Sequence, residues 1–65
     1  MNITVNGRNE SISSDSITAY IREKGMSPKA LVVELNGQVV VADRWDQTPL
    51  CEGDQLELLS FVGGG

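Results

Sequence analysis

Two Asn-Gly dipeptides, Asn6-Gly7 and Asn36-Gly37, constrain the fold of this chain more than any other feature of its sequence. Both residues of such a pair accept positive φ angles, which the tightest β-hairpin turns require. Each dipeptide lies between segments in which apolar and polar residues alternate, the pattern of a half-buried strand. The sequence therefore predicts two hairpins, one at the start of the chain and one in its middle.

The alternation of apolar and polar residues predicts five strands, four in the two hairpins and a fifth near the end of the sequence. A turn over residues 52–54 precedes the last of them, because Gly and Asp are typical turn residues. The predicted strands cover residues 1–5, 8–12, 31–35, 38–42 and 55–62.

One helix is expected between the hairpins, from residue 15 or 16 to residue 24. Serine and aspartate side chains at its start can accept hydrogen bonds from free backbone N–H groups. Ile17, Tyr20 and Ile21 share one face at helical spacing, and Gly25 is a typical residue just beyond a helix end. The pattern thus predicts a short amphipathic helix with one apolar face.

The remaining segments are expected to be irregular. Ser27-Pro28 indicates a loop, and residues 43–51 are predicted to be irregular, with Trp45 and Leu50 anchored in the core. The element order is then β-β-α-β-β-β, in which the helix must cover the apolar face of the sheet. Placing the last strand between the first and third joins both hairpins and predicts an α+β, ubiquitin-like β-grasp with a mixed sheet of about five strands.

Composition narrows the possible functions. The 65 residues suffice for one domain, predicted as a β-grasp domain over residues 1–62 and a flexible glycine tail over residues 63–65. A single cysteine, Cys51, and no histidine exclude an intramolecular disulfide and a Cys/His zinc site. The net charge of −4 argues against nucleic acid and anionic membranes as partners. Without a signal-peptide pattern, a cytoplasmic location is expected.

Gly63-Gly64-Gly65 follows the last predicted strand. Three glycines form a slim peptide ending in a carboxylate, with no side chain to hinder its approach to the active site of another enzyme. The alternatives are a frayed end or an expression remnant. The tail is not a phosphate-binding loop, because no helix or Gly-Lys-Ser/Thr element follows it.

Over nearly its whole length the chain resembles the ThiS family, small β-grasp sulfur carrier proteins of thiamin biosynthesis. The resemblance rests on the order and spacing of several short segments rather than on any one of them. The tail is one glycine longer than the usual pair, but its last residue is still glycine. The segments are MNITVNG, LNGQVV, RW, PL, EGDQL and FVGGG.

The resemblance implies that the Gly65 carboxylate is adenylated by an E1-like adenylyltransferase that uses MgATP. Sulfur from a donor protein then gives a thiocarboxylate, which a thiazole synthase consumes. The chain would bind no cofactor itself and would be a carrier rather than an enzyme, with Gly63 and Gly64 threading the tail into the partner. The alternatives are a carrier like the small subunit of molybdopterin synthase, a ubiquitin-like modifier, or an interaction module with an inert tail.

Docking is expected from the folded body. Leu59, Phe61 and Val62 are the candidate partner-binding residues, with Leu59 and Phe61 on the sheet face away from the helix; the alternative places these two beneath residues 43–51. Cys51 is either a reactive thiol or a small packing residue. Six acidic residues can steer docking onto a basic partner, or else form a solvated surface: Glu34, Asp43, Asp46, Glu52, Asp54 and Glu57.

Overall fold

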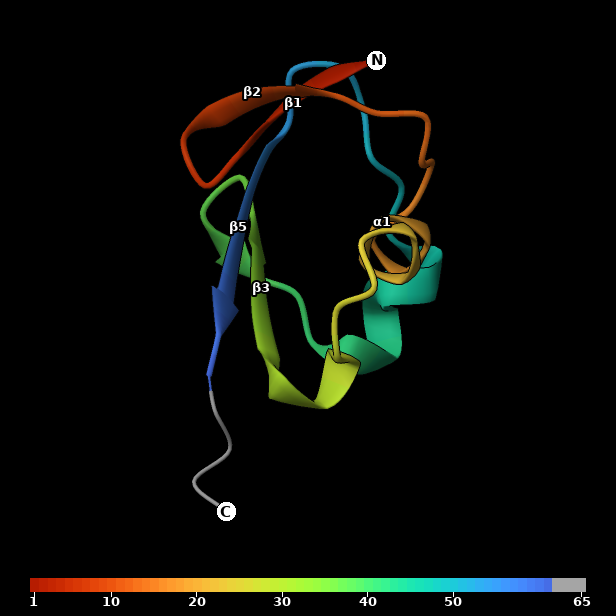
Figure 1. Cartoon of the computed structure of the whole chain (residues 1–65), viewed down its shortest axis with the longest axis vertical. Helices are drawn as coiled ribbons and strands as arrows, with labels where there is room; N and C mark the ends of the chain where they lie inside the picture. The colour runs from red at the N-terminus through yellow and green to blue at the C-terminus, as the bar shows by residue number, and fades with distance from the viewer. Residues whose placement is uncertain (62–65) are drawn as a thin grey trace.

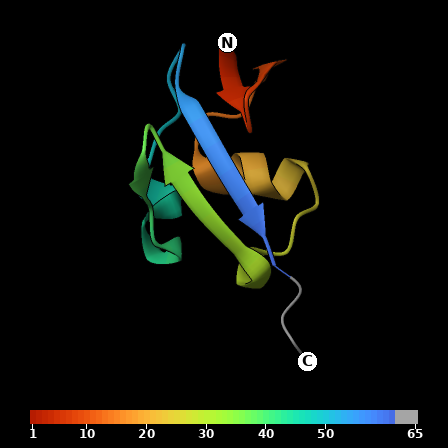
Figure 2. The same ribbon diagram turned by 90° about the vertical axis from the view of Figure 1, so that its left-hand side faces the viewer.

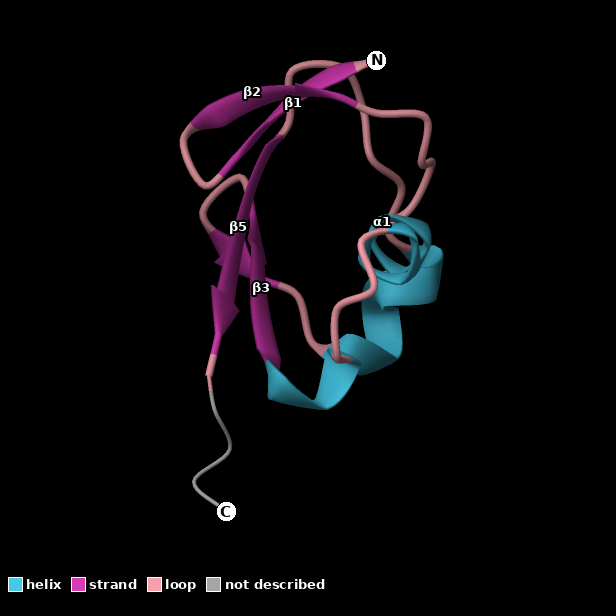
Figure 3. Cartoon of the chain, viewed as in Figure 1, coloured by secondary structure: helices cyan, strands magenta, loops and turns pink. Residues whose placement is uncertain are grey.

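The structure, a computed structural model, describes residues 1–61. A twisted sheet and one α-helix pack against each other in two layers (Figures 1 and 3). The strands are β1 (Asn2–Val5), β2 (Arg8–Ser11), β3 (Leu31–Leu35), β4 (Gln38–Val39) and β5 (Gln55–Ser60), and the helix is α1 (Ile17–Glu23). Two short 3-10 helices, η1 (Pro28–Ala30) and η2 (Ala42–Gln47), complete the described chain.

Both predicted hairpins are confirmed. β1 pairs with β2, and β3 pairs with β4, each in antiparallel orientation. The turn residues all have positive φ: 50° at Asn6, 82° at Gly7, 52° at Asn36 and 87° at Gly37. Because side chains other than those of Gly, Asn and Asp strain this backbone region, the two dipeptides fix both the position and the register of the hairpins.

The last strand lies in the centre of the sheet, as predicted. The strand order is β2-β1-β5-β3-β4, so β5 joins the two hairpins, and Figure 2 shows it beside β3. β5 runs parallel to β1 and antiparallel to β3, with Leu56 opposite Val5 on one side and Leu35 on the other. This mixed five-stranded sheet with a helix across it is the β-grasp arrangement that the sequence predicts.

The core lies between the sheet and α1 (Figure 1). Ile17 of the helix and Leu56 of the central strand are fully buried, and the expected anchors Trp45 and Leu50 are also buried. The core residues are Ile3, Val5, Ile12, Ile17, Tyr20, Ile21, Leu31, Val33, Trp45, Leu50, Leu56 and Leu58.

The helix begins and ends where its capping residues predict. The Ser16 hydroxyl accepts a hydrogen bond from the Ala19 N–H at 3.1 Å, which satisfies one of the free donors of the first turn. Lys24 caps the other end, and Gly25 follows it with a φ of 69°. The helix presents Ile17, Tyr20 and Ile21 to the core, as their spacing predicts.

Two segments differ from the prediction. β4 ends at Val39 instead of residue 42, and the chain then forms η2 in place of irregular structure. The Trp45 Nε1–H donates to the Val40 carbonyl at 2.7 Å, which diverts that carbonyl from the sheet. Backbone bonds three residues apart, such as Arg44 N–H to Val41 O, form the 3-10 turns.

Smaller differences occur elsewhere, and β1 begins at Asn2 rather than at residue 1. The Ser27-Pro28 loop contains η1, and β2 ends at Ser11 rather than residue 12. β5 ends at Ser60, although the Phe61 N–H still donates to the Ala30 carbonyl at 3.0 Å. Strand ends of this kind vary by a residue or two without a change in architecture.

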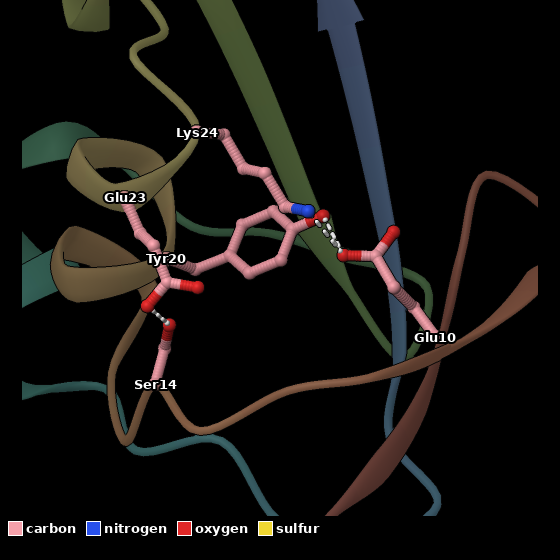
Figure 4. A network of polar contacts seen from close by, with 5 residues as sticks. All are labelled: Glu10, Ser14, Tyr20, Glu23 and Lys24. Atoms are coloured by element: carbon pink, nitrogen blue, oxygen red, sulfur yellow. Dashed lines mark hydrogen bonds and ion pairs between the residues drawn. The ribbon is translucent and has the colours of Figure 1, made fainter.

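A polar network on one side of the core ties α1 to β2 (Figure 4). The Tyr20 hydroxyl donates to Glu10 Oε1 at 2.7 Å, and Lys24 Nζ lies 3.0 Å from the same oxygen. The hydrogen bond from Tyr20, followed by that from Lys24, holds the pKa of Glu10 below its ordinary value. Burial, together with the Glu10 carboxylate, raises the pKa of Tyr20.

Candidate functional site

Some of the residues predicted to form the site are described by the structure, and the others lie beyond the last described residue. Gly63, Gly64 and Gly65, the expected reactive tail, lie outside residues 1–61, as does Val62. The division of the chain at residue 62 therefore stays a prediction. Leu59 and Phe61 are described, and they show how the chain leads into that tail.

The strand that leads to the tail is held on both sides. On one side the Asn6 N–H donates to the Leu56 carbonyl at 2.9 Å, and the Asn6 side chain accepts from the Leu58 N–H at 2.7 Å. On the other side β5 pairs with the whole of β3, from Leu31 opposite Ser60 onward. Hydrogen bonds on both edges hold the first half of β5, while its end toward Phe61 is held from the β3 side alone, where the Phe61 N–H donates to the Ala30 carbonyl at 3.0 Å.

The face of the sheet that points away from α1 carries exposed apolar side chains. Leu59 is 66% exposed and Phe61 45% exposed. The alternative that both pack beneath residues 43–51 is therefore wrong. We call the exposed apolar residues Val32, Val39, Leu59 and Phe61 the outer-face patch.

Val32 and Val39 are members of this patch that the sequence reasoning missed. Val32 lies directly opposite Leu59 and is 37% exposed, and Val39 is 62% exposed. The available signal was the alternation in β3, because Val32 occupies a solvent-facing position between the buried Leu31 and Val33. Val32 adds to the exposed apolar residues around Leu59, and contiguous exposed apolar patches mark interaction sites.

Two of the expected steering acids also accept hydrogen bonds within the fold. The Glu52 carboxylate accepts from the Asn2 N–H at 2.9 Å. Asp54 accepts from the Cys51 N–H at 2.8 Å and from Asn36 Nδ2 at 3.1 Å. These bonds tie the turn before β5 to both hairpins, so they fix the start of the central strand.

The other acids and the cysteine are exposed or half-buried. Asp43 and Asp46 lie exposed on η2, while Glu34 and Glu57 face each other across β3 and β5. Cys51 is exposed, so the interpretation as a small packing residue is wrong.

Residues 1–61 contain no group of three or more Cys, Asp or Glu side chains placed to hold a metal ion. No helix in this part of the chain is long and apolar enough to cross a membrane. A hollow of about 340 Å³ lies beside the C-terminal end of α1, lined by Thr18, Ile21, Arg22, Gly25, Met26, Pro28 and Trp45.

Comparison with solved structures supports the same fold. The chain is 35% identical to the crystal structure of a thiamine biosynthesis protein, ThiS, from Geobacter metallireducens, with full coverage of both chains and a TM-score of 0.83. A solution structure of a thiamine biosynthesis protein from the same organism is 33% identical, with a TM-score of 0.81 over all of this chain and 88% of the other.

Sequence comparison adds two curated relatives and a family. The chain is 28% identical to the sulfur carrier protein ThiS of Bacillus subtilis, over 97% of this chain and 98% of that one. It is 30% identical to a thiazole synthase of Paramagnetospirillum magneticum, over all of this chain but only 20% of that protein's length. The sequence model of the ThiS family matches residues 2–65, and the chain therefore belongs to the ThiS family.

Proposed function

We propose that this chain is a ThiS-type sulfur carrier of thiamin biosynthesis that works through the carboxylate of Gly65. The observation that carries the proposal is the family match over residues 2–65, which includes the glycine tail as well as the fold. The described structure supports it, because the central strand leads into the tail and the outer face gives partners an apolar surface.

The chemistry begins with activation, because a carboxylate is a poor acyl donor. An oxygen of the Gly65 carboxylate attacks the α-phosphorus of MgATP on an E1-like adenylyltransferase, and pyrophosphate leaves. The outer sulfur of a persulfide on a donor protein then attacks the acyl carbon and displaces AMP. A thiol reduces the resulting acyl disulfide, which breaks its S–S bond and leaves one carboxylate oxygen replaced by sulfur. The thiocarboxylate is a better nucleophile than the carboxylate, and it delivers its sulfur to a thiazole synthase.

The chain's own part is to bind and to present the tail. Gly63 and Gly64 have no side chains, so they can enter a narrow, water-excluding site. Leu59, Phe61 and Val62 are the proposed contacts outside that site. The chain holds no cofactor in this scheme, and the adenylation chemistry belongs to the partner.

The partners in this scheme are the adenylyltransferase, the sulfur donor and the thiazole synthase, all in the cytoplasm. The thiazole synthase from Paramagnetospirillum magneticum supports the last of these, because a segment similar to this whole chain occurs within it. Carrier and acceptor sequences joined in one protein are expected where the two must meet.

The test is an intact-mass measurement after incubation with MgATP, a sulfur donor and the source organism's adenylyltransferase. We expect a mass gain that corresponds to one oxygen replaced by sulfur, localised to Gly65. Deletion of Gly65 should abolish the gain, and the exposed control Asp15→Asn should leave it intact. An unchanged mass with an active adenylyltransferase would overturn the proposal, and lysine-linked conjugates of high mass would instead indicate a protein modifier.

A further inference from the structure

Two glutamates face each other on the outer side of the sheet. Glu34 of β3 and Glu57 of β5 are direct cross-strand partners. Hydrogen-bonded and non-hydrogen-bonded residue pairs alternate along two antiparallel strands. The bonds from Asn36 N–H to Gln55 O and from Phe61 N–H to Ala30 O show which pairs of β3 and β5 are hydrogen-bonded. Glu34 and Glu57 are therefore a hydrogen-bonded pair, whose Cα atoms lie about 5.5 Å apart. Like charges in this arrangement weaken a sheet.

No basic side chain of the chain compensates this pair. Within residues 1–61 the one ion pair joins Lys24 to Glu10, in the network that ties α1 to β2. Residues 62–65 contain no lysine or arginine. The two carboxylates therefore have to be balanced by solvent ions or by a partner.

Apolar side chains surround the carboxylates. A hollow of about 220 Å³ is lined by Val32, Glu34, Glu57, Leu58 and Leu59. Val32 and Leu59 form the cross-strand pair two residues away from the glutamates, and both are exposed. Figure 2 shows β3 and β5 in front of the rest of the chain on this side, with α1 behind them.

We propose that this hollow receives a basic side chain of a partner protein, with its charged group between Glu34 and Glu57 and its stem against Val32 and Leu59. Lysine and arginine both combine an apolar stem with a cationic head. Arginine fits best, because its planar guanidinium can donate to two carboxylates at once. The proposal rests on the proposed function in one respect: the partner we assign is the adenylyltransferase that acts on Gly65.

This assignment predicts opposite effects on folding and on binding. Neutralising either glutamate removes a repulsion from the free protein, so the midpoint of thermal unfolding should rise or stay unchanged. The same change removes an attraction from the complex, so affinity should fall. A purely structural role of the two residues would lower the stability of the fold instead.

The experiment compares the double variant E34Q/E57Q with D15N/E23Q, which also loses two negative charges, from exposed positions at the two ends of α1. Dissociation constants for the source organism's adenylyltransferase are measured by calorimetry at several salt concentrations. We expect E34Q/E57Q to bind at least roughly 30-fold more weakly, with a smaller salt dependence. The control should remain within about fivefold of the wild type.

Each other outcome overturns the inference. A loss of affinity smaller than roughly 30-fold in E34Q/E57Q, or no binding of the wild type, excludes a basic side chain of this enzyme in the hollow. A salt-sensitive dimer of the wild type, absent in E34Q/E57Q by sedimentation, would assign the surface to a second copy of the chain.

The two proposals fail separately. If Gly65 gains sulfur and E34Q/E57Q binds normally, the carrier function stands and the basic contact does not. If E34Q/E57Q loses affinity and Gly65 gains no sulfur, the contact stands and the carrier function does not.

Discussion

Replacing Tyr20 by Phe removes one hydroxyl and keeps the ring that packs in the core. Tyr20 is 2% exposed, and its hydroxyl donates to Glu10 Oε1 at 2.7 Å. Because the two residues come from α1 and β2, the substitution isolates the contribution of this one link between the helix and the first hairpin.

The expected cost follows from the geometry of the bond. Hydrogen bonds to charged groups contribute about 1.5–3 kcal/mol. The Glu10 side chain is 31% exposed and also contacts Lys24, so solvent and the lysine compensate part of the loss. We therefore expect Tyr20→Phe to lower the free energy of unfolding by about 1.5 kcal/mol and the melting temperature by roughly 6–12 °C.

The assay is urea unfolding followed by circular dichroism at pH 7 and at pH 3. The Glu10 pKa lies below its ordinary value of 4.5 in the folded protein, chiefly because of the Tyr20 hydrogen bond. Its stabilisation is therefore present above pH 4.5 and is lost as the pH falls through the folded-state pKa. The difference between wild type and variant should shrink at pH 3.

The control is a double-mutant cycle with Glu10→Gln, in which Tyr20→Phe should cost much less than in the wild type. An equal cost at pH 7 and pH 3, or an equal cost in both backgrounds, would refute the argument. The hydroxyl would then contribute independently of the carboxylate.

Three further measurements test the fold and the outer face. Leu56→Ala should lower the free energy of unfolding by about 2–5 kcal/mol in urea, because Leu56 is fully buried at the centre of the sheet; a loss below about 1 kcal/mol would contradict that placement. Leu59→Ser should leave stability within about 0.5 kcal/mol and weaken binding to the adenylyltransferase; destabilisation with normal binding would indicate a packing role. Above the ordinary tyrosine pKa of about 10, unfolded Tyr20 ionises while the folded form stays neutral, so wild-type stability should fall with rising pH, and Tyr20→Phe should reduce that fall.

The sequence predicts the local elements well because their causes are local. Asn6-Gly7 and Asn36-Gly37 determine their turns through the backbone conformations that these residues accept. Ser16 determines the start of the helix through its own hydrogen bond to Ala19 N–H. Such signals lie within a few residues of the structure that they specify.

Sequence patterns do not predict structure that depends on a specific contact between side chain and backbone or between residues far apart in the chain. β4 is short because the indole of Trp45 takes the carbonyl of Val40, a contact that no periodicity predicts. Asp54 holds the Asn36 side chain and the Cys51 N–H, although sequence spacing treated it as a solvated acid. The expected role of Gly65 came first from the glycine tail and then from the family resemblance, and this residue lies outside the described residues. The hollow between Glu34 and Glu57 required the strand register.

The central position of β5 has a consequence for how the protein is made. The hairpins can form in about 1–10 μs, whereas a ribosome adds about 5–20 residues per second. Residues 12 to 54 separate the first hairpin from β5. In each newly made molecule the edges of β1 and β3 that pair with β5 therefore remain unpaired for seconds. During that interval a nascent chain exposes two unpaired strand edges, which are templates for pairing with other chains.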